Sequence, residues 1–206
     1  MDKNINWMEF SSLLAGKICH DLISPISATN NGIELLEDMP NDIEVKDLIT
    51  ESAKIAQKKL QFFRLAYGAA QSYGAEIALA MLKKHAEEYF CKENVKLIWD
   101  EKMPSTLLLV VGKILYNLLL VAANFMPKGG IIKIIYGFKG ELELQLKSDK
   151  IVIPDAFKQI FIEKDTLYPL NPWSINYYHL LLLLNQQNMI LNANEINNQT
   201  ILVSYK

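Results

Sequence analysis

The stretch ICHDLISPISATNNGIELLED, residues 18–38, decides the fold of the first part of the chain. Apolar side chains recur in it at spacings of three and four, which is the repeat of one face of an α-helix. On a wheel with about 100° per residue, the apolar side chains of this region gather on one side: Leu14, Ala15, Ile18, Cys19, Leu22, Ile26, Ile33 and Leu36. The pattern predicts an amphipathic helix over residues 5–37.

The opposite side of this helix carries a polar stripe whose members follow one another at alternating spacings of three and four. The stripe consists of Lys17, His20, Ser24, Ser27 and Asn31. His20 lies in its middle, and the neighbouring side chains on that face are small or polar. We therefore expect the imidazole to be exposed and accessible to a partner protein.

The chemistry of such a histidine suits group transfer. A histidine with the ordinary pKa of about 6.5 is mostly neutral at pH 7 and offers a nucleophilic nitrogen. That nitrogen can accept a phosphoryl group as a covalent intermediate. Asp21 follows directly and can orient the imidazole or accept its proton, and Pro25 is expected to kink the helix just beyond. The spacing alone also fits a solvated histidine without a chemical role.

A second helix is predicted after a turn at residues 39–42, where Pro40 breaks the first helix and Asp42 is a suitable N-cap. It is expected to run from residue 43 to residue 70 and to form an antiparallel hairpin with the first helix. Phe62, Phe63 and Tyr67 are expected in the core of a bundle. Because a hairpin cannot bury its apolar stripe alone, we expect two copies to dimerise into a four-helix bundle.

The pattern changes near residues 72–74, so we divide the chain into residues 1–73 and 74–206. The second part mixes helices with strands and predicts an α/β sandwich, which gives the chain an overall α+β fold. Helices are expected at residues 75–90, 106–126, 155–162 and 174–187. Strands are expected at residues 95–100, 131–138, 141–147, 189–191 and 200–205. His179 is expected to be hydrogen-bonded and partly buried.

Composition excludes several classes of function. The 206 residues are 50% hydrophobic and 21% charged, with a formal net charge of −2, which is ordinary for a globular protein and gives no electrostatic footprint for nucleic acid. Cys19 and Cys91 lie far apart and predict neither a zinc site nor a disulfide. The histidines His20, His85 and His179 lack metal-ligand spacing.

No membrane or export segment is expected. The N-terminus lacks a basic segment followed by an apolar run, so we predict no signal peptide. Residues 106–126 are apolar and long enough to span a bilayer. However, Lys113, Asn117 and Asn124 share one helical stripe, which favours a helix buried against a sheet with one polar edge. We expect a cytoplasmic protein with no membrane partner.

Residues 18–38 resemble the H-box of two-component histidine kinases, H-[DE]-x-x-x-P. Together with KLQFFRLAYGAA, residues 59–70, they more closely resemble the ChpT-type bacterial histidine phosphotransferases. The resemblance implies a dimeric helical hairpin and a degenerate kinase-type (Bergerat-type) ATPase domain. It also implies that His20 relays phosphate between receiver-domain aspartates, with Asp21 as the adjacent acid. Ser24 stands where Thr or Asn is usual in kinases, which argues against kinase-style phosphatase activity.

The nucleotide motifs of a kinase are altered in the second part of the chain. Residues 117–130, NLLLVAANFMPKGG, resemble a kinase N-box, but Val121 replaces the magnesium-binding Asn and Asn124 replaces the Lys. A valine side chain has no oxygen ligand for Mg²⁺. The Asp-x-Gly-x-Gly box corresponds to SDKIVIP, residues 148–154, which has no glycine. A phosphate-binding glycine loop is also missing, because no glycine follows Gly140.

These substitutions predict a protein that binds no ATP and has no cofactor of its own. The phosphoryl donor would then be the receiver domain of a hybrid histidine kinase, the acceptor a response regulator, and Mg²⁺ would belong to the receiver. We expect Lys17, Ser24, Ser27, Asn31 and Arg64 to support receiver docking. Two alternatives remain open: an ATP-dependent sensor-kinase core, and a non-enzymatic dimeric module that binds kinases or response regulators.

Overall fold

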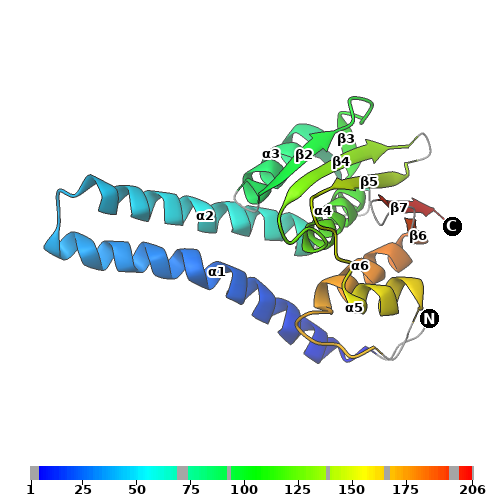
Figure 1. Cartoon of the computed structure of the whole chain (residues 1–206), viewed down its shortest axis with the longest axis horizontal. Helices are drawn as coiled ribbons and strands as arrows, with labels where there is room; N and C mark the ends of the chain where they lie inside the picture. The colour runs from blue at the N-terminus through cyan, green and yellow to red at the C-terminus, as the bar shows by residue number, and fades with distance from the viewer. Residues whose placement is uncertain are drawn as a thin grey trace.

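The computed structural model describes residues 5–68, 74–91, 94–137, 140–164, 168–194 and 200–205. Two long helices form an arm that extends from a mixed unit of helices and strands (Figure 1). The turn between the two helices lies at the far end of the arm, and their other ends meet the α/β unit (Figure 1). The predicted α+β fold is confirmed.

The arm is the predicted helical hairpin, formed by α1 (Trp7–Asp38) and α2 (Ile43–Tyr67). Asn6 caps α1, because its side chain accepts hydrogen bonds from the backbone N–H groups of residues 8 and 9. Asp42 caps α2 through the backbone N–H of Val45 at 3.1 Å, as expected. Residues 69–73, which hold the predicted end of this helix and the predicted domain boundary, lie outside the described residues.

The apolar stripe of α1 is only partly covered within one chain. Leu14, Ile18 and Leu22 are partly buried against the core. Ala15 and Cys19 are exposed. Further along the arm, several large apolar side chains of both helices are exposed as well: Ile23, Ile26, Ile33, Leu35, Ile43, Leu48 and Leu60.

The α/β unit is built on a five-stranded sheet with the order β2-β4-β5-β7-β6. The strands are β2 (Val95–Trp99), β4 (Gly130–Tyr136), β5 (Leu142–Lys147), β6 (Met189–Asn194) and β7 (Thr200–Tyr205). Strands β2 and β4 pair in parallel, and the other neighbours pair antiparallel. The remaining helices are α3 (Leu79–Phe90), α4 (Leu109–Asn124), α5 (Asp155–Phe157), the π-helix η1 (Lys158–Ile162) and α6 (Ile175–Gln186).

Two predicted helices begin later than expected, because each is preceded by a short strand. These strands, β1 (Glu76–Ala78) and β3 (Thr106–Leu108), pair antiparallel in a separate two-stranded sheet. Periodicity cannot distinguish a three-residue apolar strand from the first turn of a helix, and the pairing partner lies about thirty residues away. The predicted turn between β4 and β5 includes residues 138 and 139, which are outside the described residues.

Helix α4 is the central core helix of the α/β unit. All residues from Val111 to Ala122 are buried, including Lys113 and Asn117. The predicted burial of this segment with a polar edge is therefore confirmed, although Asn124 is exposed. None of the described helices combines the length and apolar content that a membrane span needs.

The second half of α2 packs against the α/β unit. The ring of Phe62 stacks on Tyr116 of α4 with centroids 4.4 Å apart and on Tyr89 of α3 at 4.0 Å. Phe63 is also buried and contacts Tyr89. The prediction that these aromatic residues form the core of a bundle is wrong, since periodicity identifies a buried face without identifying what covers it.

Candidate functional site

His20 lies on the hairpin with its imidazole in solvent. Its side chain is 86% exposed, which confirms the predicted exposure. The ring nitrogen Nδ1 lies 3.2 Å from Oδ1 of Asp21. An ionised carboxylate only accepts hydrogen bonds, so this geometry fits a ring with its proton on Nδ1. The other nitrogen, Nε2, then carries the free lone pair.

Asp21 is held from both sides. Its side chain is only 19% exposed, and Oδ2 lies 3.2 Å from Nζ of Lys17, one turn earlier on α1. One carboxylate oxygen therefore pairs with a lysine while the other faces the imidazole. This arrangement orients the ring and can stabilise positive charge on it, as a carboxylate does beside other catalytic histidines.

The structure separates the other predicted docking residues into two groups. Ser24, Ser27 and Asn31 are exposed on α1 in the turns that follow His20. Arg64 is exposed in the last turn of α2. Among the described residues, the Arg64 side chain makes no hydrogen bond or ion pair that would bring it to His20. The structure thus brings together Lys17, His20 and Asp21, with the three polar residues alongside.

Sequence reasoning missed one residue that reaches this site from the other helix. Nζ of Lys59, on α2, donates a hydrogen bond of 3.2 Å to the backbone carbonyl of Asp21. The available signal was Pro25, which has no N–H and leaves the carbonyl four residues earlier without its helical donor. A search for that missing donor on the facing helix would have pointed to a lysine or arginine.

The asparagine that begins the N-box-like stretch is used inside the protein. The Asn117 amide nitrogen donates to the carbonyls of Ala66, at 3.0 Å, and Lys113, at 2.8 Å. Its oxygen accepts a hydrogen bond of 3.0 Å from Nδ1 of His179. Lys113 donates in turn to the carbonyl of Gly68, just after α2. These bonds satisfy carbonyls at the C-terminal end of α2 and tie the hairpin to the α/β unit.

His179 is partly buried in this junction, as predicted. Its ring stacks on Phe10 of α1 with centroids 6.2 Å apart and meets Tyr67 of α2 edge to face. Burial disfavours the charged imidazolium and, with the nearby Lys113, lowers the pKa of His179 to about 4. The ring is therefore neutral at pH 7, and its Nδ1–H serves the hydrogen bond to Asn117.

The other kinase-like stretches also form internal contacts. Oγ of Ser148 donates a hydrogen bond of 2.6 Å to the carbonyl of Gly129. In the segment aligned with the glycine loop, the side-chain oxygen of Asn171 accepts hydrogen bonds from the backbone N–H groups of Trp173 and Ser174. Within the ranges that the structure describes, no group of three or more His, Cys, Asp or Glu side chains is arranged to hold a metal ion.

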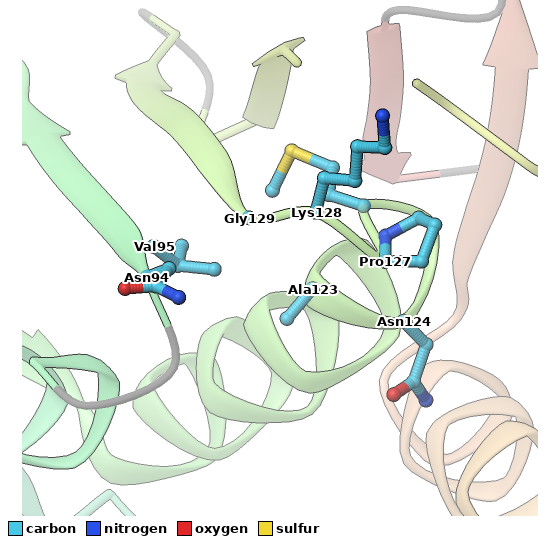
Figure 2. A pocket seen from close by; sticks show the side chains of 8 residues that line it. Asn94, Val95, Ala123, Asn124, Pro127, Lys128 and Gly129 are labelled. Carbon is cyan, nitrogen blue, oxygen red and sulfur yellow. The ribbon is translucent and has the colours of Figure 1, made fainter. Parts of the chain in front are cut away.

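A pocket of about 350 Å³ opens near the C-terminal end of α4 (Figure 2). It is lined by Asn94, Val95, Ala123, Asn124, Met126, Pro127, Lys128 and Gly129. Figure 2 shows Asn94 and Val95 on one side of the opening and Pro127 and Lys128 on the other. All of these residues belong to the α/β unit, and Lys128 is the only ionisable one among them. The pocket is therefore separate from the His20 site.

A helical hairpin that presents an exposed histidine beside a carboxylate, joined to an α/β unit, fits a class of proteins that carry phosphoryl groups on histidine. Comparison with known proteins supports this class. The family described as "Histidine phosphotransferase C-terminal domain" matches residues 79–198. The chain belongs to this histidine phosphotransferase family.

Individual relatives extend the similarity to the hairpin. The protein phosphotransferase ChpT of Brucella abortus is 33% identical over 187 residues, which cover 88% of both chains. The solved 1.7 Å structure of a bacterial phosphotransferase superposes with a TM-score of 0.80 and 29% identity. That match covers 98% of this chain and 97% of the other.

Proposed function

We propose that His20 accepts a phosphoryl group from the aspartyl phosphate of a receiver domain and passes it to the aspartate of a response regulator. The observation that carries this proposal is the exposed imidazole, with Nδ1 held by Asp21 and Nε2 in solvent. The upstream receiver is proposed to belong to a hybrid histidine kinase. Membership of the histidine phosphotransferase family supports the reaction class.

In the first step, Nε2 of His20 attacks the phosphorus, the N–P bond forms, and the bond to the donor aspartate oxygen breaks. The aspartate leaves as a carboxylate, and the proton on Nδ1 stays on the ring. Asp21 stabilises the positive charge that develops on the imidazole. In the second step, the acceptor carboxylate attacks the phosphorus and His20 leaves as neutral imidazole. Catalysis is mainly positioning.

We propose that this protein needs no ATP and no cofactor of its own, and that Mg²⁺ is supplied with the receiver domain. Two observations support this. The amide nitrogen of Asn117 donates to one carbonyl of α2 and one of α4, and its oxygen accepts from His179. Val121 is fully buried where a kinase has its magnesium-binding Asn. Incubation with radiolabelled ATP and Mg²⁺ alone is expected to leave the protein unlabelled.

We also propose that two copies pair through the hairpin to make a four-helix bundle, with the hairpin assigned to residues 1–73 and the α/β unit to residues 74–206. The exposed apolar side chains of α1 and α2, Ile26 and Ile33 among them, support a second copy as the occupant of this face. Burying them removes apolar surface from water without disturbing the polar stripe.

Receiver docking is assigned to the polar stripe and to the α/β unit beside it. Lys17, Ser24, Ser27 and Asn31 lie on the His20 helix, while Arg64 contributes positive charge from the last turn of α2. A receiver's acidic phosphorylation pocket would be attracted to such charges, so we expect an association rate that falls with salt. We propose that the reaction takes place in the cytoplasm.

The direct test combines a phosphorylated donor receiver, this protein and a second receiver, and follows the label. Label is expected to reach the second receiver with the wild-type protein and to remain on the donor with His20→Gln. If regulators bind equally well to both proteins and neither carries phosphate, the protein is a binding module. If ATP alone labels His20, the protein is a kinase core.

A further inference from the structure

Pro25 creates a defect in α1 next to the phosphoryl-acceptor site. The helix runs without interruption from Trp7 to Asp38, with Pro25 inside it. In a regular α-helix the N–H of residue 25 would donate to the carbonyl of residue 21. Proline has no N–H, and its ring pushes that carbonyl away from the helix axis. The carbonyl of Asp21 therefore lacks its helical donor and must find another.

Lys59 supplies the missing donor from the facing helix. Its ammonium nitrogen lies 3.2 Å from the Asp21 carbonyl oxygen, across 38 positions of sequence, in a partly buried setting. An ammonium group forms a stronger hydrogen bond to a carbonyl than a backbone amide does. One turn beyond Pro25, Oγ1 of Thr29 donates to the carbonyl of Pro25 at 2.9 Å.

The carbonyl belongs to the residue that holds the imidazole. Lys59 fixes the backbone of Asp21, Lys17 fixes one oxygen of its carboxylate, and the other oxygen lies 3.2 Å from Nδ1 of His20. The orientation of the carboxylate relative to the imidazole thus depends on contacts from two helices. A tether from α2 also couples the packing of the hairpin to the position of the histidine.

We propose that Lys59 is a positioning residue: it replaces the hydrogen-bond donor that Pro25 lacks, and thereby holds Asp21 where it keeps the His20 proton on Nδ1. The consequence for transfer rests on the proposed function, but the consequence for the imidazole does not. The competing explanation is that Lys59 acts only as a surface charge that attracts receivers.

The first experiment measures the tautomer of His20 by ¹⁵N NMR of the full-length protein. Lys59→Met removes the donor and keeps an unbranched side chain of similar length, and Lys59→Arg keeps a donor. We expect the Nδ1–H form in the wild type and in Lys59→Arg, and a shift toward Nε2–H in Lys59→Met. Lys58→Met is the matched control, because it removes the adjacent lysine, which makes no contact with Asp21 among the described residues.

The second experiment is a double-mutant cycle with Pro25→Ala, which restores a backbone N–H at position 25. Phosphorylation of His20 is measured with phosphoramidate, a small donor that needs no receiver docking. With Pro25 in place, Lys59→Met is expected to slow the reaction about tenfold, the size of one hydrogen bond to a charged group. In the Pro25→Ala background the same change is expected to have little effect, since the carbonyl has its helical donor.

Three results would overturn the proposal that Lys59 positions Asp21. Equal effects of Lys59→Met in both backgrounds, or equal effects of Lys58→Met and Lys59→Met, would overturn the proposal. An unchanged tautomer in Lys59→Met would overturn it as well. A further outcome separates the two proposals. If the tautomer shifts as expected but neither the wild type nor any variant passes phosphate between receivers, the inference about Lys59 stands and the proposed function fails. Unfolding curves of each variant confirm that folded protein is compared.

Discussion

The hairpin and its junction with the α/β unit differ in how far their polar side chains are exposed to solvent. On the hairpin, His20 is in solvent beside a carboxylate, and large apolar side chains such as Ile26 are exposed. At the junction with the α/β unit, His179 is partly buried, and the buried Asn117 forms hydrogen bonds with two backbone carbonyls and with the His179 ring. One histidine is therefore available for chemistry, and the other is a structural donor.

This difference shows that residue type alone does not assign function in this chain. Both rings have a hydrogen-bonded Nδ1, to Asp21 in one case and to Asn117 in the other. The partner of His20 is a charged group that can stabilise an imidazolium, whereas the partner of His179 is a neutral amide beside a lysine. Substitutions at His20 should therefore affect phosphotransfer, whereas substitutions at His179 should affect stability.

The largest expected effect comes from His20→Gln. Loss of the nucleophile is expected to reduce phosphotransfer between receivers by at least about a thousandfold. Because the side chain is exposed, the free energy of unfolding should change by no more than about 0.5 kcal/mol. Transfer is followed with labelled donor receiver, and stability by urea unfolding. Substantial transfer by a folded His20→Gln protein would contradict the proposal that His20 on the hairpin is the phosphoryl acceptor.

The exposed apolar face of the hairpin gives the next effect. Ile26→Glu combined with Ile33→Glu is expected to weaken the homodimer at least about a hundredfold, because two charges per chain would be buried in the interface. Analytical ultracentrifugation measures the dissociation constant. Ile98→Glu on β2, also an exposed isoleucine, is the matched control and should leave the dimer intact. A wild-type protein that is monomeric at all concentrations would contradict the proposed bundle.

Acid should destabilise the junction through His179. The folded-state pKa is about 4, while the unfolded state has the ordinary value of 6.5. Between these values the unfolded chain binds more protons, so stability is lost as the pH falls from about 6.5 to about 4 and is fully present above that window. A shift of this size corresponds to roughly 3 kcal/mol at most. Urea unfolding at several pH values measures it.

The control for that pH dependence is His179→Leu, which cannot titrate. The stability advantage of the wild type over this variant should decrease as the pH falls through the window, and with the full shift it should reverse in sign near pH 4. A difference that stays constant from pH 7 to pH 4 would mean that His179 does not bind its proton differently in the folded and unfolded states.

The smallest expected effect is that of the same substitution at pH 7. His179→Leu leaves the buried oxygen of Asn117 without its donor, which should cost about 2 kcal/mol of stability. Labelling of His20 by phosphoramidate should be unchanged, because the described contacts of His179 are with Asn117, Phe10 and Tyr67 and not with His20 or the side chains that position it. A selective loss of labelling in a folded His179→Leu protein would contradict the assignment of a purely structural role to His179.

The sequence predicts the hairpin well and its surroundings poorly, for physical reasons. Periodicity, Pro40 and Asp42 identify both helices, and the polar stripe correctly predicts an exposed His20. The strands β1 and β3 are missed, because their pairing is non-local and each has only three residues. The prediction that Phe62 lies in the core of a helical bundle is wrong for the same reason. Periodicity identifies the buried face of a helix but not the element that packs against it.

The candidate site is likewise predictable only where its contacts are local. His20, Asp21 and Lys17 lie within about one turn of each other on α1, so spacing brings them together. Arg64 was grouped with them by charge, but the described contacts do not bring it to His20. Lys59 was missed because its contact crosses between helices and depends on the register of the hairpin. That register follows from close packing, such as Gly32 against Ile49.

The most direct test of the proposed relay is the position of the phosphoryl group after transfer from a phosphorylated receiver. ³¹P and ¹H NMR of the phosphorylated protein, with peptide mapping by mass spectrometry, identify the residue and the ring nitrogen. The expected result is one phosphoryl group per chain, on Nε2 of His20. Phosphate on Nδ1 of that ring, or on any other residue, would contradict it.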